Sequence, residues 1–148
     1  MKSALRWLPL CFLFAGCGTI IDWREVKTDP MTIAECYDGF VYIAGKDGFA
    51  ADTAACDRGL GTWQSRWRQR ALPLGRPQRY RLRGEILLDE GSAEHGWTIR
   101  YAIEQEKVKD LRHSQNPGPS DWSPDGQDGE REATLGEKLA RRLTVKKT

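Results

Sequence analysis

Residue types that carry catalysis are scarce in this sequence. It contains two histidines, His95 and His113, and neither has a cysteine or histidine partner at the spacing of a zinc site. The chain has no GxSxG, HExxH or P-loop motif, and carboxylates such as Glu85 and Asp89 stand in no pattern that marks a glycosidase pair. We therefore expect no catalytic residues, no cofactor beyond the calcium considered below, and a protein that is not an enzyme.

Long hydrophobic runs are absent too. The apolar stretch from Trp7 to Phe14 is far shorter than the ~20 residues that a helix needs to cross a membrane. Lys2 and Arg6 precede it and small residues follow it, which is the order of parts in a cleaved secretion signal. The N-terminus therefore predicts an exported protein rather than one that spans a membrane.

The end of that signal, Phe14-Ala15-Gly16-Cys17, resembles the bacterial lipobox. The resemblance implies that residues 1–16 are a cleaved signal peptide and that Cys17 becomes a lipidated N-terminus carrying several acyl chains, palmitate among them. Such an anchor is effectively permanent, because each buried methylene contributes ~0.8 kcal/mol. Gly18 is similar to the residue that follows the cysteine in lipoproteins sorted to the outer membrane. The resemblance therefore implies a cell-envelope location, at the outer membrane facing the periplasm rather than at the inner membrane.

Two cysteines remain for the folded part of the chain, because Cys11 leaves with the signal and Cys17 is acylated. In an oxidising compartment such a pair forms a disulfide, so we expect a bond between Cys36 and Cys56. By the chain-entropy estimate, closing a loop of this length stabilises the fold by roughly 3 kcal/mol.

Hydrophobic periodicity indicates the fold class. The segments RYRLRGEILL and WTIRYAIE alternate apolar and polar residues and predict an antiparallel hairpin over about 78–104. Leu135, Leu139 and Leu143 share one stripe of a C-terminal amphipathic helix, which we expect to pack on the hairpin. The prediction is an α+β fold with a small antiparallel sheet. The expected parts of the mature chain are a lipidated N-terminus and tether (17–32), a single domain (33–143) and a basic tail (144–148).

Local signals predict the shorter elements. The β-branched and aromatic residues of 40–44 predict a strand, and Asp52 should cap a short helix. The segment 62–72 fits a helix that Thr62 caps and Pro73 stops, although its polar residues also alternate as in a strand. We favour the helix. Residues 113–129 are rich in Pro, Gly, Ser, Asn and Asp and predict a long surface loop.

The segment DWSPDGQDGERE, residues 121–132, has the ligand spacing of an EF-hand calcium loop. The candidate ligands are Asp121, Ser123, Asp125, Gln127 through its carbonyl, and Glu132. Against calcium, no helix enters the loop, and its eighth position is an aspartate rather than an apolar residue. The alternative, which we favour, is a series of Asx turns whose acids cap the following helix.

Acidic residues are missing between Arg58 and Arg83, where arginine and tryptophan recur. Guanidinium groups suit phosphate and carboxylate, and aromatic side chains add stacking. The candidate binding residues are Arg66, Arg68, Arg70, Arg79, Arg81, Arg83, Arg100 and Trp122. Behind a secretion signal, the partner would be an envelope protein or an anionic envelope component rather than nucleic acid. The alternative is that nearby acids such as Glu85, Glu104 and Glu106 neutralise these arginines within the fold.

These observations favour a non-catalytic envelope lipoprotein, an accessory or assembly subunit held to the membrane by its N-terminal lipid, which binds a partner through the Arg/Trp surface. A first alternative is a small-ligand binder, with calcium at 121–132 or an anionic glycan stacked on tryptophan. A second alternative is a cell-wall hydrolase, for which the sequence offers no catalytic pattern.

Overall fold

The computed structural model describes residues 20–70 and 75–144. The expected signal peptide, Cys17 and most of the expected basic tail lie outside the described residues. The elements, in chain order, are β1 (Arg24–Lys27), α1 (Ile33–Lys46), β2 (Thr62–Gln64), β3 (Arg68–Arg70), β4 (Gln78–Ile86), β5 (Thr98–Val108), β6 (Trp122–Gln127) and α2 (Gly129–Leu143). Short 3-10 turns lie at Thr53–Ala55, Leu111–His113 and Pro119–Asp121.

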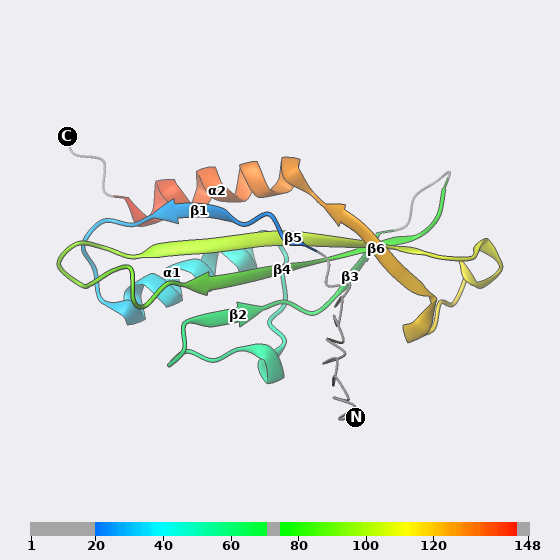
Figure 1. Ribbon diagram of the computed structural model, residues 1–148, viewed down its shortest axis with the longest axis horizontal. Helices are drawn as coiled ribbons and strands as arrows, with labels where there is room; N and C mark the ends of the chain where they lie inside the picture. The colour runs from blue at the N-terminus through cyan, green and yellow to red at the C-terminus, as the bar shows by residue number, and fades with distance from the viewer. Residues whose placement is uncertain (1–19, 71–74, 145–148) are drawn as a thin grey trace, which may run out of the picture.

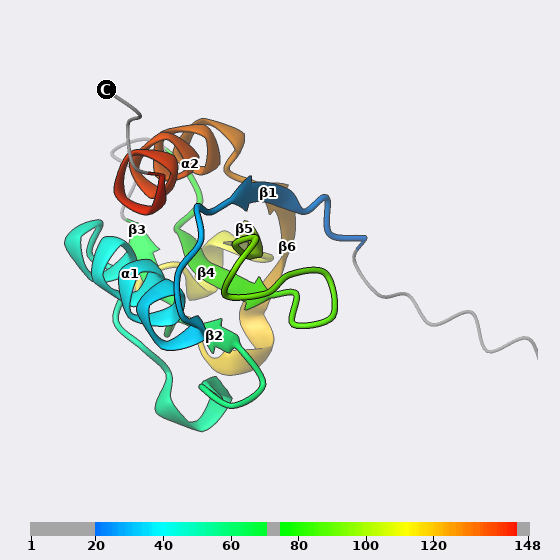
Figure 2. The same ribbon diagram turned by 90° about the vertical axis from the view of Figure 1, so that its left-hand side faces the viewer.

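One antiparallel sheet of six strands runs through the molecule (Figure 1). β4 and β5 are its central pair. β1 and β6 both pair with the outer edge of β5, and β2 and β3 both pair with the outer edge of β4. The two helices pack against each other on one face of the sheet (Figure 2). The predicted α+β fold, with its antiparallel sheet and C-terminal helix, is therefore confirmed.

The central hairpin is longer than the sequence predicted, because β5 continues to Val108. Its register sets Arg79 opposite Glu106 and Glu85 opposite Arg100. Burial alternates along β4, so that the even-numbered residues Tyr80 to Ile86 face the helices and the charged residues face away. The hairpin thus has an apolar face and a charged face, as the pleat of a strand requires.

The core lies between the sheet and the helices. Leu135, Leu139 and Leu143 of α2 are all buried in it, so the predicted amphipathic stripe is confirmed. On α1, Phe40 packs over Gly84 of β4, where a Cβ would collide with the phenyl ring. Glycine at this position therefore allows α1 to approach the sheet closely.

The strand expected at 40–44 is wrong, because these residues belong to α1. Thr32 and Glu35 form a capping box that starts the helix: the Thr32 Oγ1 accepts from the Glu35 amide at 3.2 Å, and the Glu35 carboxylate accepts from the Thr32 amide at 2.8 Å. The buried residues then recur at helical spacing, at Cys36, Tyr37, Phe40 and Ala44. Within the run 40–44, Phe40 and Ala44 are buried, whereas Tyr42 is exposed, as the period of a helix requires.

The helix expected over 62–72 is also wrong. Its described part forms β2 and β3, which pair with β4, so the strand alternative holds. Trp63 lies in the core and makes an edge-to-face contact with Phe40, with ring centres 5.6 Å apart. The predicted Asp52 cap is confirmed, because its Oδ1 accepts from the Ala54 amide at the start of a 3-10 turn.

Two segments that we expected to be irregular contain strands. β1 lies in the expected tether and pairs with Thr98–Tyr101 of β5, so the folded domain begins before residue 33. β6 lies in the expected loop 113–129 and pairs with residues 104–108 of β5. Within the ranges that the structure describes, no helix is long and apolar enough to cross a membrane.

The expected disulfide is absent, because Cys36 and Cys56 are both free thiols. Cys36 is fully buried on the core side of α1, and this burial raises the pKa of its thiol to about 12. The Cys56 Sγ lies 3.4 Å from both the backbone nitrogen and the backbone oxygen of Gln64.

Candidate functional site

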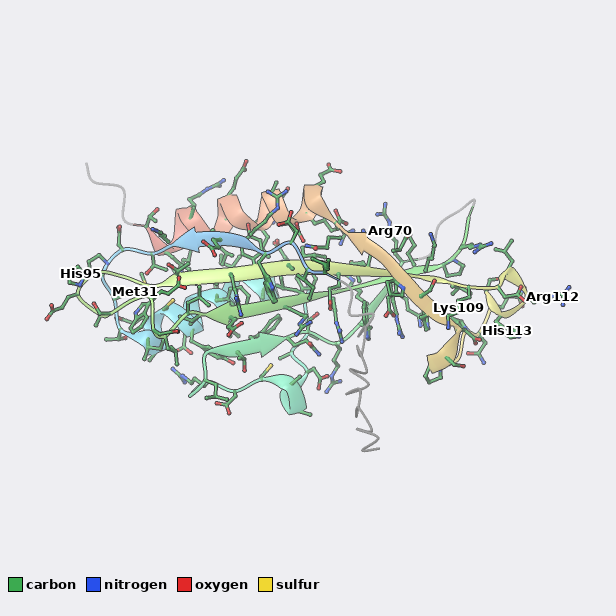
Figure 3. All side chains as sticks on the ribbon, viewed as in Figure 1. Met31, Arg70, His95, Lys109, Arg112 and His113 are labelled. Carbon is green, nitrogen blue, oxygen red and sulfur yellow. The ribbon has the colours of Figure 1, made fainter. Side chains whose placement is uncertain are left out.

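The charged side chains of the central hairpin gather on the sheet face that turns away from the helices. Arg79, Arg81 and Arg83 project there from β4 because they alternate with its buried residues. The antiparallel register brings Glu104 and Glu106 of β5 opposite Arg81 and Arg79. Figure 3 shows the dense row of side chains along these central strands.

Each arginine of this layer has a carboxylate partner. The pairs are Arg79 with Glu106 (2.6 Å), Arg81 with Glu104 (2.6 Å), Arg83 with Glu104 (3.4 Å) and Arg100 with Glu85 (2.6 Å). Their side chains are only 16% to 37% exposed, so most of each charged group is packed against neighbours rather than solvated. The alternative that acids within the fold neutralise these arginines is therefore what the structure shows.

Three tryptophans pack on this layer of ion pairs within cation–π distance. The distances from guanidinium carbon to ring centre are 4.6 Å for Arg79 and 4.4 Å for Arg81 at Trp67, 4.5 Å for Arg79 at Trp122, and 5.7 Å for Arg83 and 5.0 Å for Arg100 at Trp23. We call this layer the open face. It consists of Trp23, Trp67, Trp122, Arg79, Arg81, Arg83, Arg100, Glu85, Glu104 and Glu106.

The other three predicted arginines lie elsewhere. Arg66 is exposed ahead of β3. Arg68 donates to the Gly48 carbonyl at 3.4 Å, and Arg70 borders a polar cavity between the sheet and α2 (Figure 3). Trp122 belongs to the open face but is only 6% exposed. The predicted set therefore does not form one surface.

The candidate calcium segment 121–132 is divided between strand β6 and the first turn of α2. Side chains in it are bonded to protein groups: Asp121 to the Gly118 amide (2.7 Å), Asp125 to Lys107 (2.7 Å), and the Gln127 side chain to both the Asp22 backbone and Glu132. The bonds from the Gly118 amide and from His113 hold the pKa of Asp121 below its usual range. In the described ranges, three or more His, Cys, Asp or Glu side chains nowhere come together in a group that could hold a metal ion. The two histidines, His95 and His113, lie at opposite ends of the molecule (Figure 3).

A cavity of about 350 Å³ opens where β1, β5 and β6 meet, beside the open face. The two outer strands leave a gap along β5, and Glu132 of α2 fills it. The Glu132 carboxylate is 4% exposed and accepts from the Ile103 amide (2.8 Å), Arg24 Nε (3.0 Å) and Gln127 Nε2 (2.8 Å). We call this cavity the notch; its lining includes Ile20, Ile21, Trp67, Arg81, Glu104, Glu106 and Pro124.

No protein-family model matches the chain, and a search of curated proteins finds no match either. The proposed function therefore rests on the chemistry of the open face and of the notch.

Proposed function

We propose that the protein is a non-catalytic envelope lipoprotein that binds another protein through the open face. The observation that supports this proposal is an ordered layer of arginine, glutamate and tryptophan on one face of the sheet. The helices α1 and α2 lie on the other face (Figure 2). Tryptophan and arginine are the residue types most enriched in the energetic centres of protein interfaces. Their ion pairs and ring contacts restrict them before binding, which lowers the entropy cost of association.

A protein suits this face better than a polyanion does. Four arginines stand against three glutamates, so the face has little net charge. A phosphate-rich polymer would have to compete with carboxylates that already lie 2.6 Å from Arg81 and Arg100. A protein surface can instead offer both charges and apolar groups in a complementary arrangement.

The proposed lipid anchor would keep the open face close to the membrane. β1 begins at Arg24, seven residues after Cys17, and a chain of that length spans at most about 25 Å. The partner would then lie in or on the same membrane. Fractionation of cells that produce the Cys17→Ala variant tests the anchor. The variant should move to the soluble fraction and lose incorporation of labelled palmitate, and an unchanged membrane fraction contradicts the lipid anchor.

Photocrosslinking in intact cells tests the partner site. Benzoylphenylalanine at position 67 replaces one aromatic side chain by another and should trap a discrete envelope protein. The matched control is position 42, because Tyr42 is 52% exposed and is also contacted by two cations, Lys46 and Arg142, but lies on the helix layer. Equal adducts from both positions, or lipid adducts alone from position 67, contradict a protein partner on the open face.

A further inference from the structure

The notch is lined by residues of two kinds. Ile20, Ile21, Pro124 and the indole of Trp67 are apolar. The polar lining includes the Arg81 and Glu104 pair. A volume of about 350 Å³ is at the lower end of the range in which proteins bind small molecules. The notch therefore fits a small ligand that has an apolar side and a polar side.

Trp67 is positioned to stack on a ring. Arg79 and Arg81 come from the same face of β4, two residues apart, and both guanidinium groups lie within 4.6 Å of the Trp67 ring centre. Both guanidinium groups therefore hold the indole in place. The indole is half-buried and borders the notch, so its exposed part can contact the C–H face of a sugar ring.

The polar lining residues offer donors and acceptors without excess charge. Arg81 uses Nε for Glu104, while its terminal nitrogens donate to no other described residue. The Glu104 carboxylate is shared by Arg81 and Arg83, and the buried Glu132 is held by Arg24. An anionic ligand would meet these carboxylates and a cationic ligand would meet the arginines, whereas hydroxyl groups can bond to both.

We propose that the notch binds a neutral saccharide, with a sugar ring stacked on Trp67 and its hydroxyl groups bonded to Arg81 and Glu104. The anionic glycan that the sequence suggested suits this site less well, because its arginines are already neutralised. This proposal does not rest on the protein-binding proposal. Saccharide binding is measured on the purified protein, and partner binding in cells, so each can fail without the other.

Nuclear magnetic resonance of the ¹⁵N-labelled indole groups tests the site. The mature protein, in detergent, is titrated separately with N-acetylchitotetraose, maltotetraose, mannotriose and an anionic hyaluronan tetrasaccharide. We expect the Trp67 indole signal to shift saturably with at least one neutral saccharide, with a Kd of about 1 mM or tighter. A shift that occurs only with the anionic saccharide, or no shift with any of the four, overturns the proposal.

Two variants check that the notch is responsible. Trp67→Ala removes the stacking surface and should weaken binding at least about tenfold, by loss of ring contact. Ile20→Asp changes an apolar lining residue, and because Ile20 is 92% exposed, its replacement should leave the fold intact. It should weaken binding as well, while Tyr42→Ala on the helix layer should leave binding unchanged. Binding that survives both notch variants, monitored on the remaining indole signals, places the saccharide elsewhere and refutes the site.

Discussion

Removal of the Glu132 carboxylate should break the link between α2 and the middle of β5. Along β5, the pairing with β1 stops at Tyr101 and the pairing with β6 starts at Glu104. The Ile103 amide, between these two positions, therefore has no strand partner on that edge. The Glu132 side chain, 4% exposed, accepts from this amide at 2.8 Å. In Glu132→Ala the amide stays buried without an acceptor.

The size of the effect follows from which groups lose a partner. A buried donor left without an acceptor costs about 1–3 kcal/mol. Arg24 also loses its partner, but its side chain is 47% exposed, so water solvates the charge and adds little to the cost. Glu132→Ala should therefore lower the free energy of unfolding by about 2–3 kcal/mol. Glu132→Gln keeps an oxygen for the Ile103 amide and should lose about half as much.

Urea denaturation followed by circular dichroism measures both variants, and hydrogen exchange locates the effect. The Ile103 amide should be protected in the parent protein and in Glu132→Gln, but should exchange faster in Glu132→Ala. Glu137→Ala removes an exposed acid from the same helix and should change stability by less than about 0.5 kcal/mol. The reasoning is refuted if Glu132→Ala behaves like this control, or if the glutamine variant is as unstable as the alanine variant.

Three further predictions concern packing, thiols and pH. Gly84→Ala should destabilise the protein by about 1–3 kcal/mol, because the new Cβ overpacks against Phe40. Gly45→Ala has nothing within 4 Å of the new Cβ and should stabilise the protein by about 0.5–1 kcal/mol. Thermal melts in which both variants are less stable than the parent contradict this. Iodoacetamide should label native Cys56 long before the buried Cys36, and labelling of neither without a reductant would reveal a disulfide. The folded-state pKa of Asp121 is depressed, so its stabilising contribution is present above its unfolded pKa and is lost as pH falls through the folded value. A carboxyl titration should therefore give Asp121 a midpoint below that of an ordinary aspartate. Asp121→Asn should make the free energy of unfolding depend less on pH at acidic pH. An ordinary midpoint for Asp121 contradicts the hydrogen-bonding argument.

The hairpin and α2 could be predicted because their patterns are long. Apolar and polar residues alternate along β4 and along β5 as far as Glu104, and three leucines mark one stripe of α2. The short elements were misassigned because a few residues satisfy two periods at once. For α1, the informative signal was the Thr32 to Glu35 capping box rather than the β-branched run that follows it. For β2 and β3, pairing with β4 overrode the weak helical pattern.

The open face could not be predicted from charge along the chain. Residues 58–83 contain no acid, which suggested a free cationic surface, but the partners of Arg79, Arg81 and Arg83 come from β5, some twenty residues or more further on. Spacing does not specify this register, and a slip of one residue would move Glu106 and Glu104 away from Arg79 and Arg81. Trp23 was missed for a similar reason, since only the pairing of β1 with β5 brings it to Arg100.

The pairing changes what kind of recognition this surface can perform. A free arginine patch would attract polyanions over distances set by the Debye length, and its affinity would fall steeply with salt. On the open face each arginine already lies within 3.4 Å of a carboxylate, and the indoles of Trp23 and Trp67 pack on the pairs. Long-range attraction is therefore largely cancelled, while the shape and the hydrogen-bonding groups are fixed. Binding at this face should depend on local fit, and its affinity should vary only weakly between low and physiological salt.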